Sequence, residues 1–196
     1  MASTKAATRR RRLSREDWVA AAIDAIAEAG MSAVAVEPLA ERLGVTKGSF
    51  YAHFSSRDEL IEAALASWEQ SHGSGLAEVS EIEDPAERLR AVLLAAVTFS
   101  QSGAPSAHMN LLGELQDPRV RGAVAHVTAR RVERLTETYR QLGMSPRRAA
   151  DRARMAYATY LGLLQMAREA PDRTMSDREI ARFMDELIAA MIPATR

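Results

Sequence analysis

Short polar and cationic side chains are concentrated in one stretch of the 196-residue chain, which runs from Val36 to Phe54. The group consists of Thr46, Lys47, Gly48, Ser49, Tyr51 and His53. Hydroxyl, ammonium and imidazole groups hydrogen-bond to phosphate oxygens and to base edges, and a glycine lets another molecule come close to the backbone. The group is therefore suited to contacts with phosphates and base edges.

Two short helices joined by a tight turn at Gly44 must position this group. Leu39, Ala40 and Leu43 recur at three- and four-residue spacing, which predicts a helix with one apolar stripe that ends at Leu43. Glycine tolerates the left-handed conformation that such a turn requires. We expect Thr46 to be the N-cap of the second helix, with its hydroxyl accepting a hydrogen bond from an unpaired amide.

Phe50 and Phe54 lie four residues apart in the second helix and are expected to point together into the core. The polar group then faces outward, where a helix that enters the major groove presents its N-terminal residues to base edges. The pattern predicts a helix-turn-helix. The alternative is a glycine-containing turn that serves packing alone, because short motifs of this kind are weak evidence by themselves.

The flanking sequence favours the helix-turn-helix. Ser14 to Asp17 forms a capping-box pattern that opens a helix closed by Gly30, and Ser56 to Glu59 repeats the pattern. These signals predict a three-helix unit over residues 13–58, followed by a connecting helix over residues 59–72.

The run from Leu13 to Trp68, with A-E-R-L-G-V-T-K-G-S-F-Y-A-H-F-S-S-R-D-E-L-I at its centre, resembles the N-terminal domain of the TetR family of bacterial transcriptional regulators. The resemblance covers about the first third of the chain. It implies that Thr46, Tyr51 and His53 contact phosphates, that Lys47, Gly48 and Ser49 lie nearest base edges, and that Arg57 binds a phosphate from the start of the next helix. The alternatives are a solvated or capping role for His53 and core packing for Tyr51.

Residues 1–12 contain Lys5 and four consecutive arginines, Arg9 to Arg12, and no acidic residue. This composition predicts a disordered basic arm. Beside a helix-turn-helix, such an arm could enter a minor groove or follow phosphates; a solvated tail is an equal alternative.

Composition narrows the functional classes. The formal net charge is zero, so affinity for DNA must come from a local concentration of positive charge. The chain has no cysteine, its four histidines have no metal-ligand spacing, and none of the usual catalytic motifs occurs. We expect a cytoplasmic protein that is not an enzyme and that uses no metal, cofactor or membrane anchor.

After a Gly-, Ser- and Glu-rich loop near residues 71–84, capping signals predict five further helices. Their expected spans are about 85–102, 106–116, 118–142, 146–169 and 177–191. No strand pattern appears. The fold class is therefore expected to be all-α, with a helix-turn-helix domain at the N-terminus and a larger helical domain over residues 59–196 for effector binding and dimerisation.

The segment from Met155 to Met166 is apolar around most of its circumference, so it needs cover on two sides. A symmetry mate can supply one side, and the resembled family dimerises through its last two long helices. We expect Leu161, Leu164, Phe183 and Leu187 to lie in a homodimer interface that sets two reading helices about 34 Å apart on a palindromic operator. Burial of this helix within one subunit is the alternative.

The resembled family also binds small apolar effectors in its C-terminal domain, and binding shifts the connecting helix. The expected pocket residues combine apolar bulk with hydroxyl groups: Trp68, Phe99, Met109, Leu112, Tyr157 and Tyr160. The predicted function is a DNA-binding regulator, a repressor released by a lipophilic effector. The alternative is a ligand-independent DNA-binding or interaction dimer without a pocket, in which these side chains are ordinary core.

Overall fold

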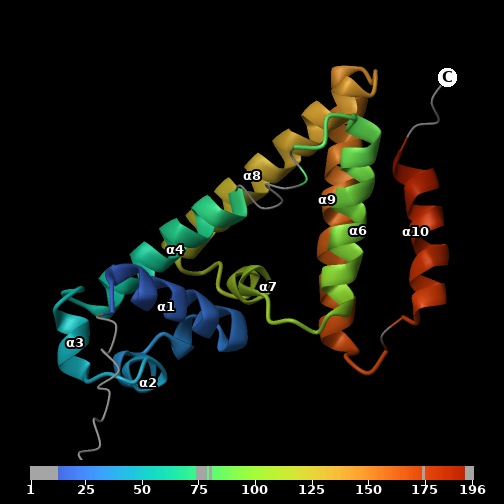
Figure 1. Ribbon diagram of the computed structural model, residues 1–196. Helices are drawn as coiled ribbons and strands as arrows, with labels where there is room; N and C mark the ends of the chain where they lie inside the picture. Colours follow the sequence, from blue (N-terminus) through green and yellow to red (C-terminus); the bar gives the residue numbers. More distant parts are fainter. Residues whose placement is uncertain (1–12, 74–78, 80, 174, 193–196) are drawn as a thin grey trace, which may run out of the picture.

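The computed structural model describes residues 13–73, 79, 81–173 and 175–192, and the regular structure within these ranges is entirely helical (Figure 1). The elements are α1 (Arg15–Ala29), η1 (Met31–Ala33), α2 (Val36–Arg42), α3 (Lys47–Tyr51), α4 (Arg57–Gly73), α6 (Pro85–Gln101), α7 (Ala107–Leu112), α8 (Pro118–Gln141), α9 (Pro146–Glu169) and α10 (Asp177–Met191). The all-α prediction is confirmed. The predicted basic arm lies outside the described residues.

Side-chain caps fix where several helices begin. Ser14 and Asp17 exchange two hydrogen bonds in a capping box at the start of α1. Asp84 and Asp117 each accept a hydrogen bond from a backbone amide of the following turn, with a proline in the first helical position. These caps satisfy amides that have no partner within the helix, which is why the sequence signals located the helix starts well. The predicted 106–116 helix is wrong at its end, because α7 stops at Leu112 and the chain turns at Gly113.

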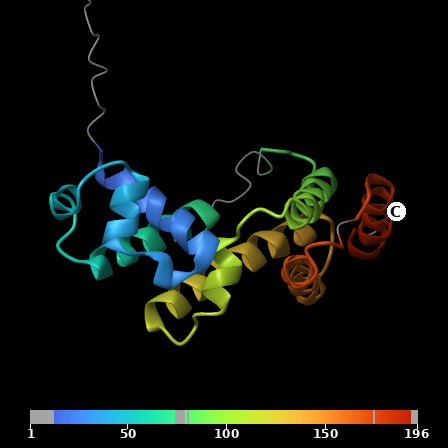
Figure 2. The same cartoon turned by 90° about the horizontal axis from the view of Figure 1, so that it is seen from below.

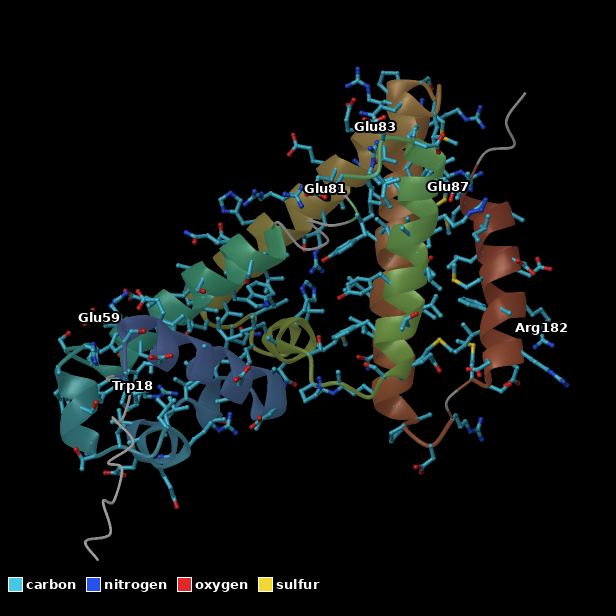
Figure 3. All side chains as sticks on the ribbon, viewed as in Figure 1. Trp18, Glu59, Glu81, Glu83, Glu87 and Arg182 are labelled. Atoms are coloured by element: carbon cyan, nitrogen blue, oxygen red, sulfur yellow. The ribbon has the colours of Figure 1, made fainter. Side chains whose placement is uncertain are left out.

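The buried apolar side chains form two cores. The first joins α1 to α4 with α7 and the N-terminal half of α8, and it includes Trp18, Phe50, Leu60 and Val124. Figure 3 marks Trp18 within this N-terminal part. The second core joins α6, the C-terminal half of α8, α9 and α10. Because α8 contributes to both cores, a displacement at one core has a direct mechanical route to the other.

The longer helices form one slanted pair and one upright pair (Figures 1 and 2). Helix α4 packs along α8 in the slanted pair, and α6 packs against α9 in the upright pair. Helix α10 lies beyond the upright pair, at the opposite end of the molecule from α3. Within the described residues, no helix is both long enough and apolar enough to cross a membrane.

The short helix α7 ties the C-terminal helices to the first three. The Asn110 side-chain amide donates hydrogen bonds to the carbonyl oxygens of Ile26 and Ala27, both at 2.9 Å. The Glu114 carboxylate accepts a hydrogen bond from the Met31 amide at 3.3 Å. Ala27 lies in the last turn of α1, where carbonyl groups run out of partners in their own helix, and Ile26 O also accepts from the Gly30 amide at 2.9 Å. Helix α7 thus acts as a tertiary cap for α1.

Candidate functional site

The turn between α2 and α3 has the geometry predicted from the sequence. Gly44 has a φ of 66°, which L-residues with a side chain rarely adopt. Its amide donates to Glu41 O at 3.0 Å, and the Val45 amide donates to Ala40 O at 2.9 Å. These bonds satisfy the C-terminal carbonyls of α2 and direct the chain sharply into α3.

Aromatic packing holds α3 on the molecule. Phe50 is fully buried, contacts Trp18 edge-to-face at 5.3 Å between ring centroids, and stacks on Phe54 at 5.6 Å. The inner face of α3 is therefore the one predicted. Tyr51 is 58% exposed, so it does not pack in the core.

The rest of the polar group lies around this anchored helix. Thr46, Lys47 and Gly48 are exposed, and Ser49 and His53 are half-buried. Thr46 is the N-cap of α3, but the prediction that its hydroxyl caps the helix is wrong, since that side chain makes no capping hydrogen bond. A Cβ at Gly48 would meet only Thr46 Oγ1, at an ordinary 3.7 Å, so packing within the chain does not require glycine there.

Two of the predicted DNA-contacting cations already have partners within the chain. Lys47 Nζ lies 2.6 Å from Glu37 Oε1 on α2, an exposed pair that lowers the pKa of Glu37 and raises the pKa of Lys47 through their shared hydrogen bond. The Arg57 guanidinium donates to the carbonyl oxygens of Val34 and, at 2.8 Å, Met31. Arg57 therefore braces the segment between α1 and α2 from the start of α4.

A cavity of about 700 Å³ lies between α6, α8 and α9. Three of the predicted pocket residues, Phe99, Tyr157 and Tyr160, line it. The prediction is corrected for the other three. Trp68 and Leu112 pack in or against the first core, and Met109 is buried outside the cavity wall, because α4 and α7 belong to the N-terminal packing unit.

Sequence reasoning missed a polar chain beside the cavity. The Tyr157 hydroxyl lies 3.1 Å from Thr128 Oγ1 on α8 and 3.3 Å from His108 Nε2 on α7. The His108 ring in turn lies 5.7 Å from that of Trp68 on α4. The cavity wall is thereby linked to α7 and α4 through side chains in contact.

Sequence reasoning also missed Arg131, although its spacing along α8 indicated that it faces inward. It lies four residues after the buried Val127 and four before Leu135, on the inner stripe of α8. The structure places it in the cavity wall, with its guanidinium 5.4 Å from the centre of the Tyr160 ring.

The four residues predicted at a dimer interface are not equally available. Leu164 and Leu187 are each only 6% exposed, and Leu187 packs in the second core, so the prediction is corrected for them. Leu161 and Phe183 are half-buried. The outward stripe of α9 instead carries Met155, Ala158, Gly162 and Met166, and the two methionines are 55% and 67% exposed.

Within the described residues, no group of three or more acidic or histidine side chains is placed to hold a metal ion. An anchored helix-turn-helix, followed by a larger helical domain with a cavity, is the architecture of a helix-turn-helix DNA-binding regulator.

Comparisons with known proteins agree with this class. The family described as "Bacterial regulatory proteins, tetR family" matches residues 19–64. The HTH-type transcriptional regulator TtgR of Pseudomonas putida is 36% identical over 76 residues, which are 39% of this chain and 36% of that protein. The chain thus aligns with about a third of the length of this curated relative.

Two solved structures extend the similarity to almost the whole fold. A TetR transcriptional regulator from Legionella pneumophila superposes with a TM-score of 0.76 at 16% identity, covering 92% of this chain and 98% of that one. A transcriptional regulator from a Rhodococcus species gives 0.71 at 25% identity, covering 91% and 96%. Residues 19–64 thus match the TetR family of bacterial regulatory proteins, and the fold of the described residues is that of solved TetR regulators.

Proposed function

We propose that this protein is a cytoplasmic transcriptional repressor that binds a palindromic operator as a homodimer and is released by a small-molecule effector. The observation that carries the proposal is α3, a short helix anchored by a buried Phe50 with its polar side chains outward. Such a helix can enter the major groove without disturbing the core beneath it.

In the proposed complex, the exposed end of α3 reads DNA. Lys47, Gly48 and Ser49 are nearest the base edges, and the open surface at Gly48 lets the backbone approach the duplex. Thr46, Tyr51 and His53 contact phosphates, which set register and orientation. For Arg57 to bind a phosphate, its guanidinium must share its hydrogen atoms between that phosphate and the carbonyl oxygens of Met31 and Val34.

Dimerisation uses the outward stripe of α9 in this proposal. Met155 and Met166 expose apolar surface, and Ala158 and Gly162 between them allow close approach of a second helix. Nothing lies within 4 Å of the position that a Cβ at Gly162 would occupy. A two-fold axis at this stripe would place one reading helix on each side of the dimer.

Release by an effector requires that the ligand favour a non-binding arrangement of the two reading heads. The cavity is walled by α8, which also packs in the first core, and Tyr157 is joined to His108 on α7. A ligand that displaces either helix therefore acts on the support of α1 and α4. A cavity of about 700 Å³, within the usual size range of ligand sites, argues against the ligand-independent dimer.

The proposal is tested by gel shift on DNA upstream of the protein's own coding region. We expect binding at low salt and a loss of affinity when Lys47, Tyr51 and Arg57 are all changed to Ala. Arg182→Ala is the matched control, because Arg182 lies on α10, far from α3 (Figure 3). Failure of the wild-type protein to bind, or wild-type affinity in the folded triple variant, would contradict the proposal.

A further inference from the structure

The charge inside the cavity bears on the kind of ligand it accepts. Four charged side chains line the wall: Arg88, Arg131, Arg134 and Glu137. Arg88 donates to Ile82 O at 2.7 Å and to the Gln141 side chain. Glu137 lies 3.6 Å from Arg140, outside the cavity lining. The two remaining arginines, Arg131 and Arg134, have no carboxylate partner among the described residues.

Of these two arginines, Arg131 bears more directly on the choice of ligand. Its terminal nitrogen Nη1 is buried and has no hydrogen-bond partner in the described part of the chain. The Tyr160 ring faces the guanidinium at 5.4 Å, but an aromatic face does not satisfy N–H groups directed along the guanidinium edge. A buried cationic group with an unsatisfied donor is costly, so the Arg131 guanidinium in the cavity wall favours a ligand that brings an anion.

The remaining wall is suited to an apolar body. Val92, Ala96, Phe99 and Leu163 line the cavity from α6 and α9. Phe99 is 37% exposed in the chain as it stands, which leaves an aromatic surface available for a ligand to cover. The site thus combines an apolar wall with an unneutralised arginine at one part of its lining.

We propose that the effector is an amphiphilic anion, with a carboxylate or phosphate bound by Arg131 and an apolar body covered by α6 and α9. This inference rests on the proposed function for its regulatory meaning, but the ligand preference itself is measurable without DNA. A guanidinium binds a carboxylate through two parallel hydrogen bonds, whereas an alcohol offers one weaker acceptor and an amine repels it.

Calorimetric titration of the full chain with two sets of matched probes tests the inference. One set is decanoate, decanol and decylamine below their micellar concentrations, and the other is naphthoate, naphthylmethanol and naphthylmethylamine. We expect at least one carboxylate to bind about 10-fold or more tightly than its alcohol, with the amine weakest. Arg131→Gln should remove this preference and Arg131→Lys should keep its order. Arg130→Gln, at the exposed neighbouring position outside this cavity, should leave the affinities unchanged.

Three results would overturn the inference: no carboxylate binds, an alcohol or amine binds as tightly as its carboxylate, or folded Arg131→Gln retains the preference. If Arg131→Gln does not fold, the order of the three wild-type affinities in each set decides. Operator binding measured in parallel separates this inference from the proposed function. If a carboxylate binds without releasing DNA, the inferred ligand class holds and the proposed release by an effector is contradicted. If neutral probes alone release DNA, the proposed release by an effector holds and the inferred ligand class is contradicted.

Discussion

Lys47 has two possible kinds of partner, the Glu37 carboxylate at 2.6 Å and, in the proposed complex, the phosphates or base edges of the duplex. The hydrogen bond holds the pKa of Glu37 below and that of Lys47 above their ordinary values, so both groups are ionised at neutral pH. Both side chains are largely exposed, and exposed pairs exchange partners at small cost. In the proposed complex, Glu37 therefore competes with DNA for Lys47, the only lysine of α3.

Glu37→Gln should strengthen operator binding by roughly twofold to fivefold, because it removes both the competing partner and a negative charge beside the duplex. Fluorescence anisotropy at several salt concentrations measures this change. Glu41→Gln is the matched control, since Glu41 is exposed on the same short helix without an ion-pair partner among the described residues. An unchanged or weaker affinity for Glu37→Gln would show that the pair persists in the complex.

Arg57 has a structural role that a motif comparison does not reveal. Its two hydrogen bonds to Met31 O and Val34 O hold the chain between α1 and α2. Arg57→Ala should therefore lower the free energy of unfolding by about 1–2 kcal/mol, in addition to any loss of DNA affinity. Urea unfolding followed by circular dichroism checks this. A variant with wild-type stability and reduced DNA affinity would assign Arg57 to phosphate binding alone.

At the scale of elements, the sequence was most informative where a local rule decides the conformation. Gly44 and the cap at Ser14 act within a few residues of themselves, and their predicted roles agree with the structure. The approximate starts of the C-terminal helices were predictable for the same reason.

The surroundings of a side chain were harder to predict where they depend on residues far away in the sequence. Trp68 and Tyr157 have similar character and helical spacing, yet α4 belongs to the first core and α9 forms the cavity wall. Leu187 has the spacing expected of an interface residue, yet α10 buries it in the second core. Periodicity indicates which residues share a face, but only tertiary structure shows what covers that face.

Helix α7 is the element whose importance the sequence did not indicate. Asn110→Ala should lower the free energy of unfolding by about 1–3 kcal/mol, because Ala27 O loses its donor and Ile26 O keeps only the Gly30 amide. Chemical denaturation measures the change. Gln116→Ala, an exposed amide after α7 whose side chain makes no hydrogen bond within the described residues, should have little effect. Equal stability of both variants would contradict the capping role of α7.

At the scale of the whole molecule, two cores share α8, and the cavity lies against the second of them. Helix α3 lies at one end of the molecule, and α9, which carries the outward stripe, lies in the other half (Figures 1 and 2). In the proposed dimer, the spacing of the two reading heads therefore depends on the packing that connects α9 to α3. A ligand among these helices is well placed to change that spacing.

Gly162→Glu should shift the protein from dimer to monomer without unfolding it, because a Cβ there meets no atom within 4 Å in the chain but would enter the proposed interface. Sedimentation equilibrium measures the change. Gly122→Glu is a matched control, since Gly122 is also exposed in a long helix with open space around its Cβ position. An unaltered dimer in Gly162→Glu would place the interface elsewhere.

The central claim, sequence-specific DNA binding by a symmetric pair of reading helices, is tested most directly by selecting bound sequences from a random DNA pool. The account predicts enrichment of a palindrome whose half-sites lie about one helical turn, roughly 34 Å, or a multiple of it apart. The enrichment should disappear when Lys47 and Tyr51 are both changed to Ala. No enriched sequence, or a single unsymmetrical site bound by a monomer, would contradict the account.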